Sequence, residues 1–157
     1  MMIETSTIRC PDQSIISYDD FVRQIVDEAF SDSEIAIGSD SQVLDTHVSF
    51  VTCICIHYPG RGGKFFFIKE RENRKNFPNM RIRLMNELFR SIEVANDLKK
   101  IISKNISIHA DIGFEEKRSQ TAKLSKEFIG IANSMGYNCS IKPDSWASYI
   151  ADRFTKS

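Results

Sequence analysis

Two aspartates in this sequence, Asp40 and Asp111, each follow a short run of strand-forming residues. An isolated carboxylate among apolar residues costs several kcal/mol, or its pKa shifts until it is neutral. If the two strands are parallel neighbours, the two carboxylates meet at one edge of the sheet and repel each other. A divalent cation removes that repulsion, and oxygen-only ligation favours Mg²⁺ or Mn²⁺ over zinc. The pair therefore predicts a metal site.

Such a site needs further carboxylates from neighbouring elements. Glu87 lies between Leu84 and Leu88 on the border of an apolar helical stripe, from which it could lean over the sheet edge. Near the end of the chain, Asp144 and Asp152 are eight residues apart and so lie along one side of a helix. Either of them could complete the site.

Each carboxylate also has an explanation without chemistry. Asp40 could cap a turn through Ser41 and Gln42, Glu87 could be an ordinary solvated helix residue, and Asp144 is well placed as a simple helix N-cap. The arrangement of the surrounding elements must decide between these alternatives.

The chain has 157 residues and is predicted to be one domain, residues 1–157, in which residues 1–13 form either a loose arm or an edge strand. Apolar periodicity and turn residues predict helices and strands in alternation. The helices are expected at 17–30, 80–100, 115–135 and 144–154, and the strands at 35–40, 48–57, 64–69, 106–111 and 139–142.

This order predicts an α/β fold with a mixed five-stranded sheet and helices on both faces. The first three strands are joined by short turns and form an antiparallel meander, whereas the last two are expected to run parallel to the first. No repeat or linker interrupts the pattern.

Residues 69–83 carry six basic and two acidic side chains and lie between the meander and the Glu87 helix. The candidates for binding nucleic acid are Arg71, Arg74, Lys75, Phe77 and Arg81, with the cations on phosphates and the ring on a base. The alternative is a solvated loop. The whole chain has 21 basic and 21 acidic residues, so it has no global basic signature.

The four cysteines include no CxxC pair, and Cys53 and Cys55 stand in an apolar run, which predicts buried reduced thiols. The first residues lack the basic and apolar regions of a signal peptide, and no apolar run approaches the length of a membrane span. A soluble cytoplasmic protein is expected.

The sequence resembles the ribonuclease H superfamily, in the order of its acids and in two helix motifs, Met85-Asn-Glu-Leu88 and Ile150-Ala-Asp-Arg-Phe154. It is most similar to one branch, the YkuK family of small bacterial proteins, over nearly the whole chain after residue 13. The matching pieces are 37–42, 57–63, 109–113 and 142–148, together with Ala151-Asp152.

The resemblance implies that Asp40, Glu87 and Asp111 bind metal, with Asp152 as the fourth ligand and Asp144 in an auxiliary role. The implied activity is metal-dependent hydrolysis of phosphodiesters in RNA, an RNA–DNA hybrid or structured DNA, with two metal ions as the usual arrangement. The alternative is a non-catalytic ribonuclease H-like module that binds nucleic acid or a protein partner.

Overall fold

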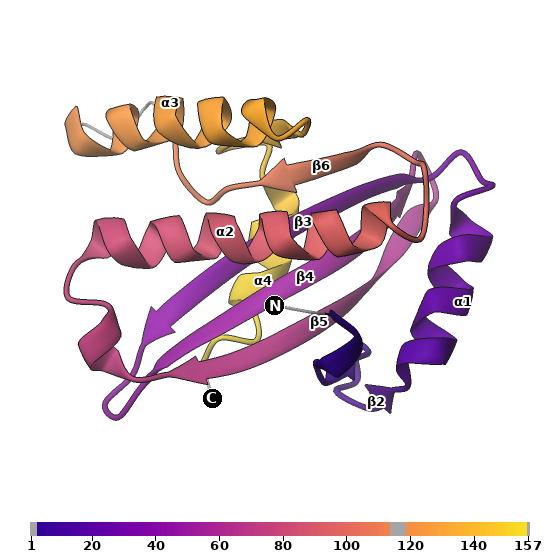
Figure 1. Ribbon diagram of the computed structural model, residues 1–157, viewed down its shortest axis with the longest axis horizontal. Coiled ribbons are helices and arrows are strands. Elements are labelled where there is room, and N and C mark those ends of the chain that lie inside the picture. The colour runs from indigo at the N-terminus through magenta and orange to yellow at the C-terminus, as the bar shows by residue number, and fades with distance from the viewer. Residues whose placement is uncertain (1–2, 114–118, 157) are drawn as a thin grey trace.

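The computed structural model describes residues 3–113 and 119–156, with the backbone alone at 119–122 (Figure 1). The predicted start of the third helix at Glu115 lies outside the described residues. In chain order the elements are η1 (Ile3–Thr5), β1 (Ile8–Arg9), β2 (Ile15–Ile16), α1 (Tyr18–Glu28), β3 (Glu34–Val43), β4 (Val48–Tyr58), β5 (Gly62–Glu72), η2 (Arg74–Asn76), α2 (Met80–Lys99), β6 (Ile106–His109), α3 (Ser119–Ser134), β7 (Asn138–Ser140) and α4 (Trp146–Asp152).

The sheet has seven strands in the order β2-β1-β5-β4-β3-β6-β7, so the prediction of a five-stranded sheet is wrong. The two additional strands come from the start of the chain, where Ile8 pairs with Ile68 of β5 and β2 pairs with β1. Strands of two residues are too short to show a hydrophobic period, which is why the sequence did not reveal them. Of the two alternatives for residues 1–13, the structure has a strand, β1, although β2 and not β1 lies at the edge of the sheet.

The long meander β3-β4-β5 is antiparallel, and β6 runs parallel to β3 on its other side. The strand ends differ from the prediction. β3 continues past Asp40 to Val43, because β4 pairs with it over its whole length. β6 instead ends at His109, two residues before Asp111, and its last pair is with Gly38. Beyond Gly38 the β3 edge is therefore open on the β6 side.

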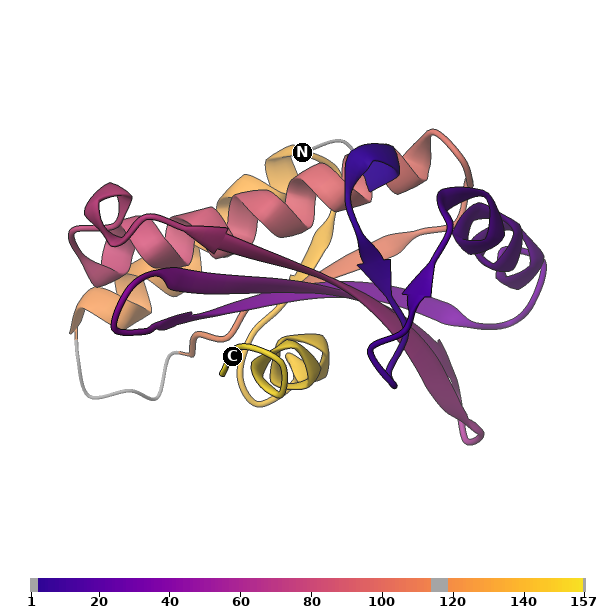
Figure 2. The same cartoon turned by 90° about the horizontal axis from the view of Figure 1, so that it is seen from below.

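Helices cover both faces of the sheet (Figure 2). The helices α1, α2 and α3 pack on one face around the larger hydrophobic core, which includes Phe21, Ile92 and Phe128. The short helix α4 lies alone on the other face, where Ala147 and Ala151 contact a smaller core. The α4 face carries the even-numbered residues of β3, and the α2 face carries the odd-numbered ones.

Gly38 allows α4 to lie directly on β3. A Cβ at this position would lie 2.6 Å from the carbonyl carbon of Ala147, and the backbone of Ser148 is as close. Atoms in van der Waals contact are about 3.5–4.0 Å apart, so any larger residue would push α4 away from the sheet. The position of α4 therefore depends on the absence of a side chain at Gly38.

The helix starts agree only partly with the sequence. Ser17 caps α1, and its hydroxyl accepts the N–H of Asp20, as predicted. Phe30, at the end of the helix predicted over 17–30, falls beyond the end of α1 and is 89% exposed. The N-cap of α4 is Ser145, so the explanation of Asp144 as a helix cap is wrong.

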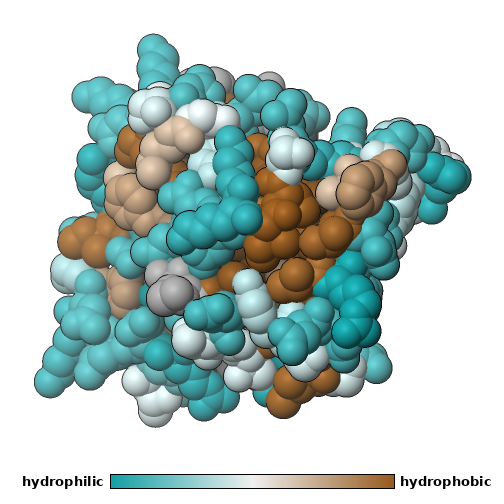
Figure 3. Space-filling view, turned by 45° about the vertical axis from the view of Figure 1, so that its right-hand side comes forward, coloured by the Kyte–Doolittle hydropathy of each residue, from teal (hydrophilic) through white to brown (hydrophobic). Residues whose placement is uncertain are grey.

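All four cysteines are unpaired, and Cys53 and Cys55 are buried, as predicted. Burial raises the pKa of the Cys55 thiol to about 12, so it stays protonated. Among the described helices, none is both long and apolar enough to cross a bilayer. Figure 3 shows that hydrophobic side chains reach the surface on one face, surrounded by hydrophilic ones.

Candidate metal centre

Four of the predicted carboxylates come together at the open edge of β3. Asp40 lies on β3 itself and Glu87 reaches it from α2, on one face of the sheet. Asp152, at the end of α4, reaches it from the other face, within hydrogen-bond distance. Asp111 follows the end of β6, close enough to act electrostatically on both Asp40 and Glu87. Because β6 has ended, side chains from both faces can meet here.

Asp40 is buried, with 8% of its surface exposed. Burial, a hydrogen bond with Asp152 and the nearby charge of Asp111 raise the pKa of Asp40 to about 7, against the single opposing effect of the Ser41 backbone N–H. A carboxyl group that ionises only near neutrality is crowded by other carboxylates and short of positive charge. The alternative of a simple turn cap does not apply, because Asp40 lies within a strand.

Glu87 is buried more deeply, with 5% of its surface exposed, so it is not a solvated helix residue. Burial and the charges of Asp40 and Asp111 raise its pKa, and Arg83 opposes them. Its Oε1 atom has no hydrogen-bond partner within the described part of the chain. An unpartnered buried carboxylate oxygen is costly and needs a proton or a cation.

The position of Glu87 is fixed by its own helix. Ser91 lies one turn further along α2, and its hydroxyl is 2.7 Å from that of Ser39 on β3. The Ser39 hydroxyl also donates to Thr52 on β4, at 3.0 Å. This buried chain of hydroxyls holds α2 in register with β3, and Glu87 therefore lies beside Asp40.

Asp111 has a cationic neighbour that the sequence analysis did not single out. Lys142 follows β7, and its Nζ atom lies 3.4 Å from Oδ1 of Asp111. A small cavity of about 10 Å³ lies between Asp111 and Glu87 and is also lined by Ser39 and His109. Such a volume is close to the least that a single water molecule needs.

Helix α4 is held on the sheet at both ends, which positions Asp152. Near its start, the backbone N–H of Ala147 donates to Nδ1 of His109 at 3.1 Å. Just after its end, the hydroxyl of Thr155 donates to Oε1 of Gln42 at 3.2 Å. Burial lowers the pKa of His109 to about 4, so its ring is neutral and can accept this bond. His109 therefore positions α4.

Asp144 does not join the four carboxylates that interact around Asp40. It is exposed, in a turn in which its backbone N–H donates to the carbonyl of Ile141, and its charge acts on His109. With His109 and Trp146 it lines a separate open pocket of about 660 Å³. Of the two candidates for the fourth carboxylate, the structure places Asp152 beside Asp40.

The four carboxylates are not yet arranged around one point. Within residues 3–113 and 119–156, no three Asp, Glu, His or Cys side chains form a group that could hold a metal ion as they stand. The side chains instead share hydrogen bonds in pairs, Asp40 with Asp152 and with Glu87, while Lys142 approaches Asp111.

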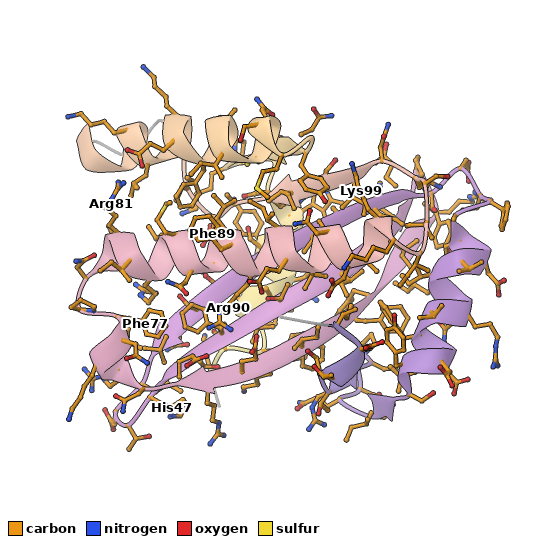
Figure 4. The ribbon with its side chains drawn as sticks, viewed as in Figure 1. His47, Phe77, Arg81, Phe89, Arg90 and Lys99 are labelled. Carbon is orange, nitrogen blue, oxygen red and sulfur yellow. The ribbon has the colours of Figure 1, made fainter. Side chains whose placement is uncertain are left out.

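Three of the five side chains that were predicted to contact nucleic acid make contacts within the protein instead. Phe77 packs on Phe50, with 4.9 Å between ring centres, and Figure 4 shows it below α2 near Arg90. Arg74 donates to the backbone carbonyl of Asp45.

Arg81 points from α2 towards α3 and pairs with Glu127 at 2.8 Å (Figure 4). Lys75 is exposed in η2, and Arg71 is exposed on β5.

Two cations near the carboxylates were missed as site residues. Arg83 donates to the backbone carbonyl and the hydroxyl of Ser41, at 3.2 and 3.0 Å, and its charge acts on Glu87. Arg83 is one turn before Glu87 on the same helix. This spacing, visible in the sequence, would have predicted that Arg83 lies beside Glu87. Lys142 follows a strand that was predicted to run parallel to the strand before Asp111. The sequence could therefore also have predicted that Lys142 lies at the same edge of the sheet.

A mixed sheet with a long antiparallel meander, a parallel strand beside it and acids at the junction is the arrangement of ribonuclease H-like folds. The family model described as Ribonuclease H-like matches residues 18–156, and the chain belongs to this ribonuclease H-like family. Among its relatives, the chain is similar to the uncharacterized protein YkuK of Bacillus subtilis (strain 168). The two are 29% identical over an alignment covering 78% of each chain.

Proposed function

We propose that this protein is a divalent-metal-dependent phosphodiesterase that acts on nucleic acid: RNA, an RNA–DNA hybrid or structured DNA. Asp40, Glu87, Asp111 and Asp152 would hold Mg²⁺ or Mn²⁺. One observation carries the proposal: four carboxyl groups from four separate segments converge at an open sheet edge, where Arg83 and Lys142 are the cations found beside them among the described residues.

The donor set fits such an ion. All four candidates are carboxylates, which suit hard cations such as Mg²⁺ and Mn²⁺. The Oε1 atom of Glu87 is buried without a hydrogen-bond partner among the described residues, and Asp40 lacks compensating charge. Binding would require loss of the proton that Asp40 retains near pH 7 and movement of Lys142 away from Asp111.

When bound, the metal ions would activate a water molecule and stabilise the charge that develops on the leaving oxygen. The protein's own contribution is to hold its carboxylates in place. Asp40 is fixed by the central strand, Glu87 by the hydroxyl chain through Ser91, and Asp152 by the clamped helix α4. Lys142, once released from Asp111, would be free to approach a phosphate.

A second candidate is a ribonuclease H-like module that binds nucleic acid or a protein partner without catalysis. The observation that favours it is the contact between Lys142 and Asp111, in which a cation of the protein occupies the place of an ion. Under either proposal a cytoplasmic location fits the four unpaired cysteines, because thiols remain reduced in the cytoplasm.

The first test follows the melting temperature while Mn²⁺ or Mg²⁺ is added to the wild-type protein, Asp40→Asn and Glu87→Gln. A metal at about a hundred times its dissociation constant stabilises the folded protein by about 2.7 kcal/mol. This stabilisation is expected in the wild type and not in either variant. Asp45→Asn is the matched control, since Asp45 is exposed in the turn between β3 and β4.

The second test is hydrolysis of labelled single-stranded RNA, an RNA–DNA hybrid and hairpin DNA with each protein. Metal-dependent cleavage that both site variants lose, and the control keeps, would support the enzyme. Binding of nucleic acid without metal stabilisation or cleavage would support the non-catalytic module instead.

A further inference from the structure

A groove of about 550 Å³ lies on the α4 face of the sheet, and its lining is strongly basic. Its lining comes from β5, from β1 and the turn after it, which adjoin β5 in the sheet, and from the residues after α4. Among the described residues its lining has five cations and no acid: Arg9, Lys69, Arg71, Arg153 and Lys156, with Thr7, Gln13, Phe67 and Phe154. In a chain of zero net charge, this is a marked local concentration of positive charge.

The register of the sheet explains why these side chains meet. Phe67, Lys69 and Arg71 alternate along β5 and so point to the same face. Arg9 on β1 pairs directly with Phe67 and points the same way. Arg153 follows Asp152, the last residue of α4. Three segments that are far apart in the sequence therefore contribute to one charged surface.

The cations in the groove repel one another. Burial lowers the pKa of Lys69, and the charges of Arg71 and Arg9 lower it further. Arg71, Arg153 and Lys156 form no ion pair with a carboxylate within the described residues. Arginines elsewhere do: Arg61 pairs with Asp32, and Arg90 with two glutamates. A polyanion would relieve this repulsion.

The groove begins beside the carboxylates. Asp40 pairs with Val51, and Val51 pairs with Lys69, so Asp40 and Lys69 lie on the same face two strand spacings apart, about 10 Å. Arg153 is the next residue after Asp152. A chain of phosphates lying in the groove would therefore pass directly to the candidate metal centre.

We propose that this groove binds the sugar–phosphate backbone of single-stranded nucleic acid and leads the strand to Asp40. That the strand ends at a catalytic metal centre rests on the proposed function. The binding of the strand in the groove does not. A single strand suits this lining better than a duplex, because its unpaired bases are free to stack on an aromatic side chain. Phe154, stacked on Phe67 at 4.1 Å between ring centres, adds an apolar surface beside the cations, as in other single-strand grooves.

The test compares two triple variants that remove the same charge. The groove variant is Arg71→Gln, Arg153→Gln and Lys156→Gln, all exposed side chains. The control variant is Lys100→Gln, Lys123→Gln and Lys126→Gln, which are exposed at the end of α2 and on α3. Lys69 is left unchanged, because it is partly buried.

Binding is measured by fluorescence anisotropy with labelled twenty-nucleotide oligothymidylate and oligouridylate and a duplex of the same length. The solutions contain EDTA, so that the result does not depend on a metal. The groove variant is expected to bind either single strand at least about tenfold more weakly than the wild type and the control. Its slope of log K against log salt should fall by about 2, at about 0.7 for each lost phosphate contact.

Three results would overturn the proposal. They are equal weakening by both triple variants, no binding by the wild type at about 50 mM salt, and tighter binding of the duplex or of vesicles containing phosphatidylglycerol. Since these measurements use no metal, loss of metal binding at Asp40 would leave the groove intact. Failure of the groove would likewise leave the metal titration to decide the site.

Discussion

Replacing Asp40 with asparagine should make the metal-free protein more stable while removing its metal response. The pKa of Asp40 is raised from 3.8 to about 7, because burial, Asp152 and Asp111 all oppose its charge. A shift of about three units at 1.36 kcal/mol each means that ionising Asp40 costs the folded state about 4 kcal/mol. Asparagine has nearly the same shape and no charge, and its amide can donate to Asp152 or Glu87.

The expected gain in the free energy of unfolding of Asp40→Asn depends on pH. Folding raises the pKa of Asp40, so between about pH 4 and 7 the folded protein holds more protons than the unfolded chain. The free energy of unfolding of the wild type therefore falls through this window as the pH rises, and the full cost is present above pH 7. Asp40→Asn should gain almost nothing at pH 4 and up to about 4 kcal/mol at pH 8.

The assay is thermal and urea unfolding with EDTA, at pH 4 and pH 8, for the wild type, Asp40→Asn and the exposed control Asp45→Asn. For a chain of this size, about 4 kcal/mol corresponds to a rise in Tm of roughly 10 °C. The control should move by less than about 0.5 kcal/mol at either pH. If Asp40→Asn is no more stable than the wild type at pH 8, the carboxylates are not crowded and the electrostatic argument for the site is wrong.

Three further predictions follow from the same contacts. The affinity for Mn²⁺, measured by calorimetry, should rise from pH 6 to pH 8, because binding must displace the proton of Asp40; an affinity independent of pH would contradict this. Gly38→Ala should cost roughly 3 kcal/mol in urea unfolding and weaken Mn²⁺ stabilisation, because it displaces α4. Gly130→Ala on α3, which has open space around it, should be neutral or stabilising by up to about 1 kcal/mol. Arg90→Gln should lower the free energy of unfolding by about 2 kcal/mol in the same urea assay. The reason is that the Arg90 side chain is 12% exposed, pairs with two glutamates and lies 4.1 Å from the ring centre of Phe50. Arg90→Lys, which keeps the charge, should recover part of this loss.

The sequence predicted the main elements well, because their hydrophobic periods are long. The central strand from Val48 and the helix from Met80 were both found with nearly correct bounds. For residues 1–13 the sequence left a loose arm and an edge strand both open, since two residues carry no period and only pairing with β5 makes β1 a strand. Leaving this strand undecided also concealed the part of the basic groove that Arg9 lines.

The site shows the same division. The sequence alone identified Asp40 and Asp111 as candidate site residues. An acid next to a run of apolar strand residues is expected to be buried, and a buried carboxylate is costly unless a cation or a proton accompanies it. It could not determine whether Glu87 was buried, since that depends on the hydroxyls of Ser39 and Ser91 meeting across α2 and β3.

The choice between Asp144 and Asp152 was likewise decided by tertiary structure. Both acids have suitable spacing, but the N-cap of α4 is Ser145, one residue later than the predicted Asp144, and Gly38 lets the helix lie close against β3. That contact brings the end of the helix, and not its start, to the open edge beside Asp40. Local pattern thus determined which residues are charged and which elements carry them, whereas the packing of α4 and the early end of β6 determined which charges meet.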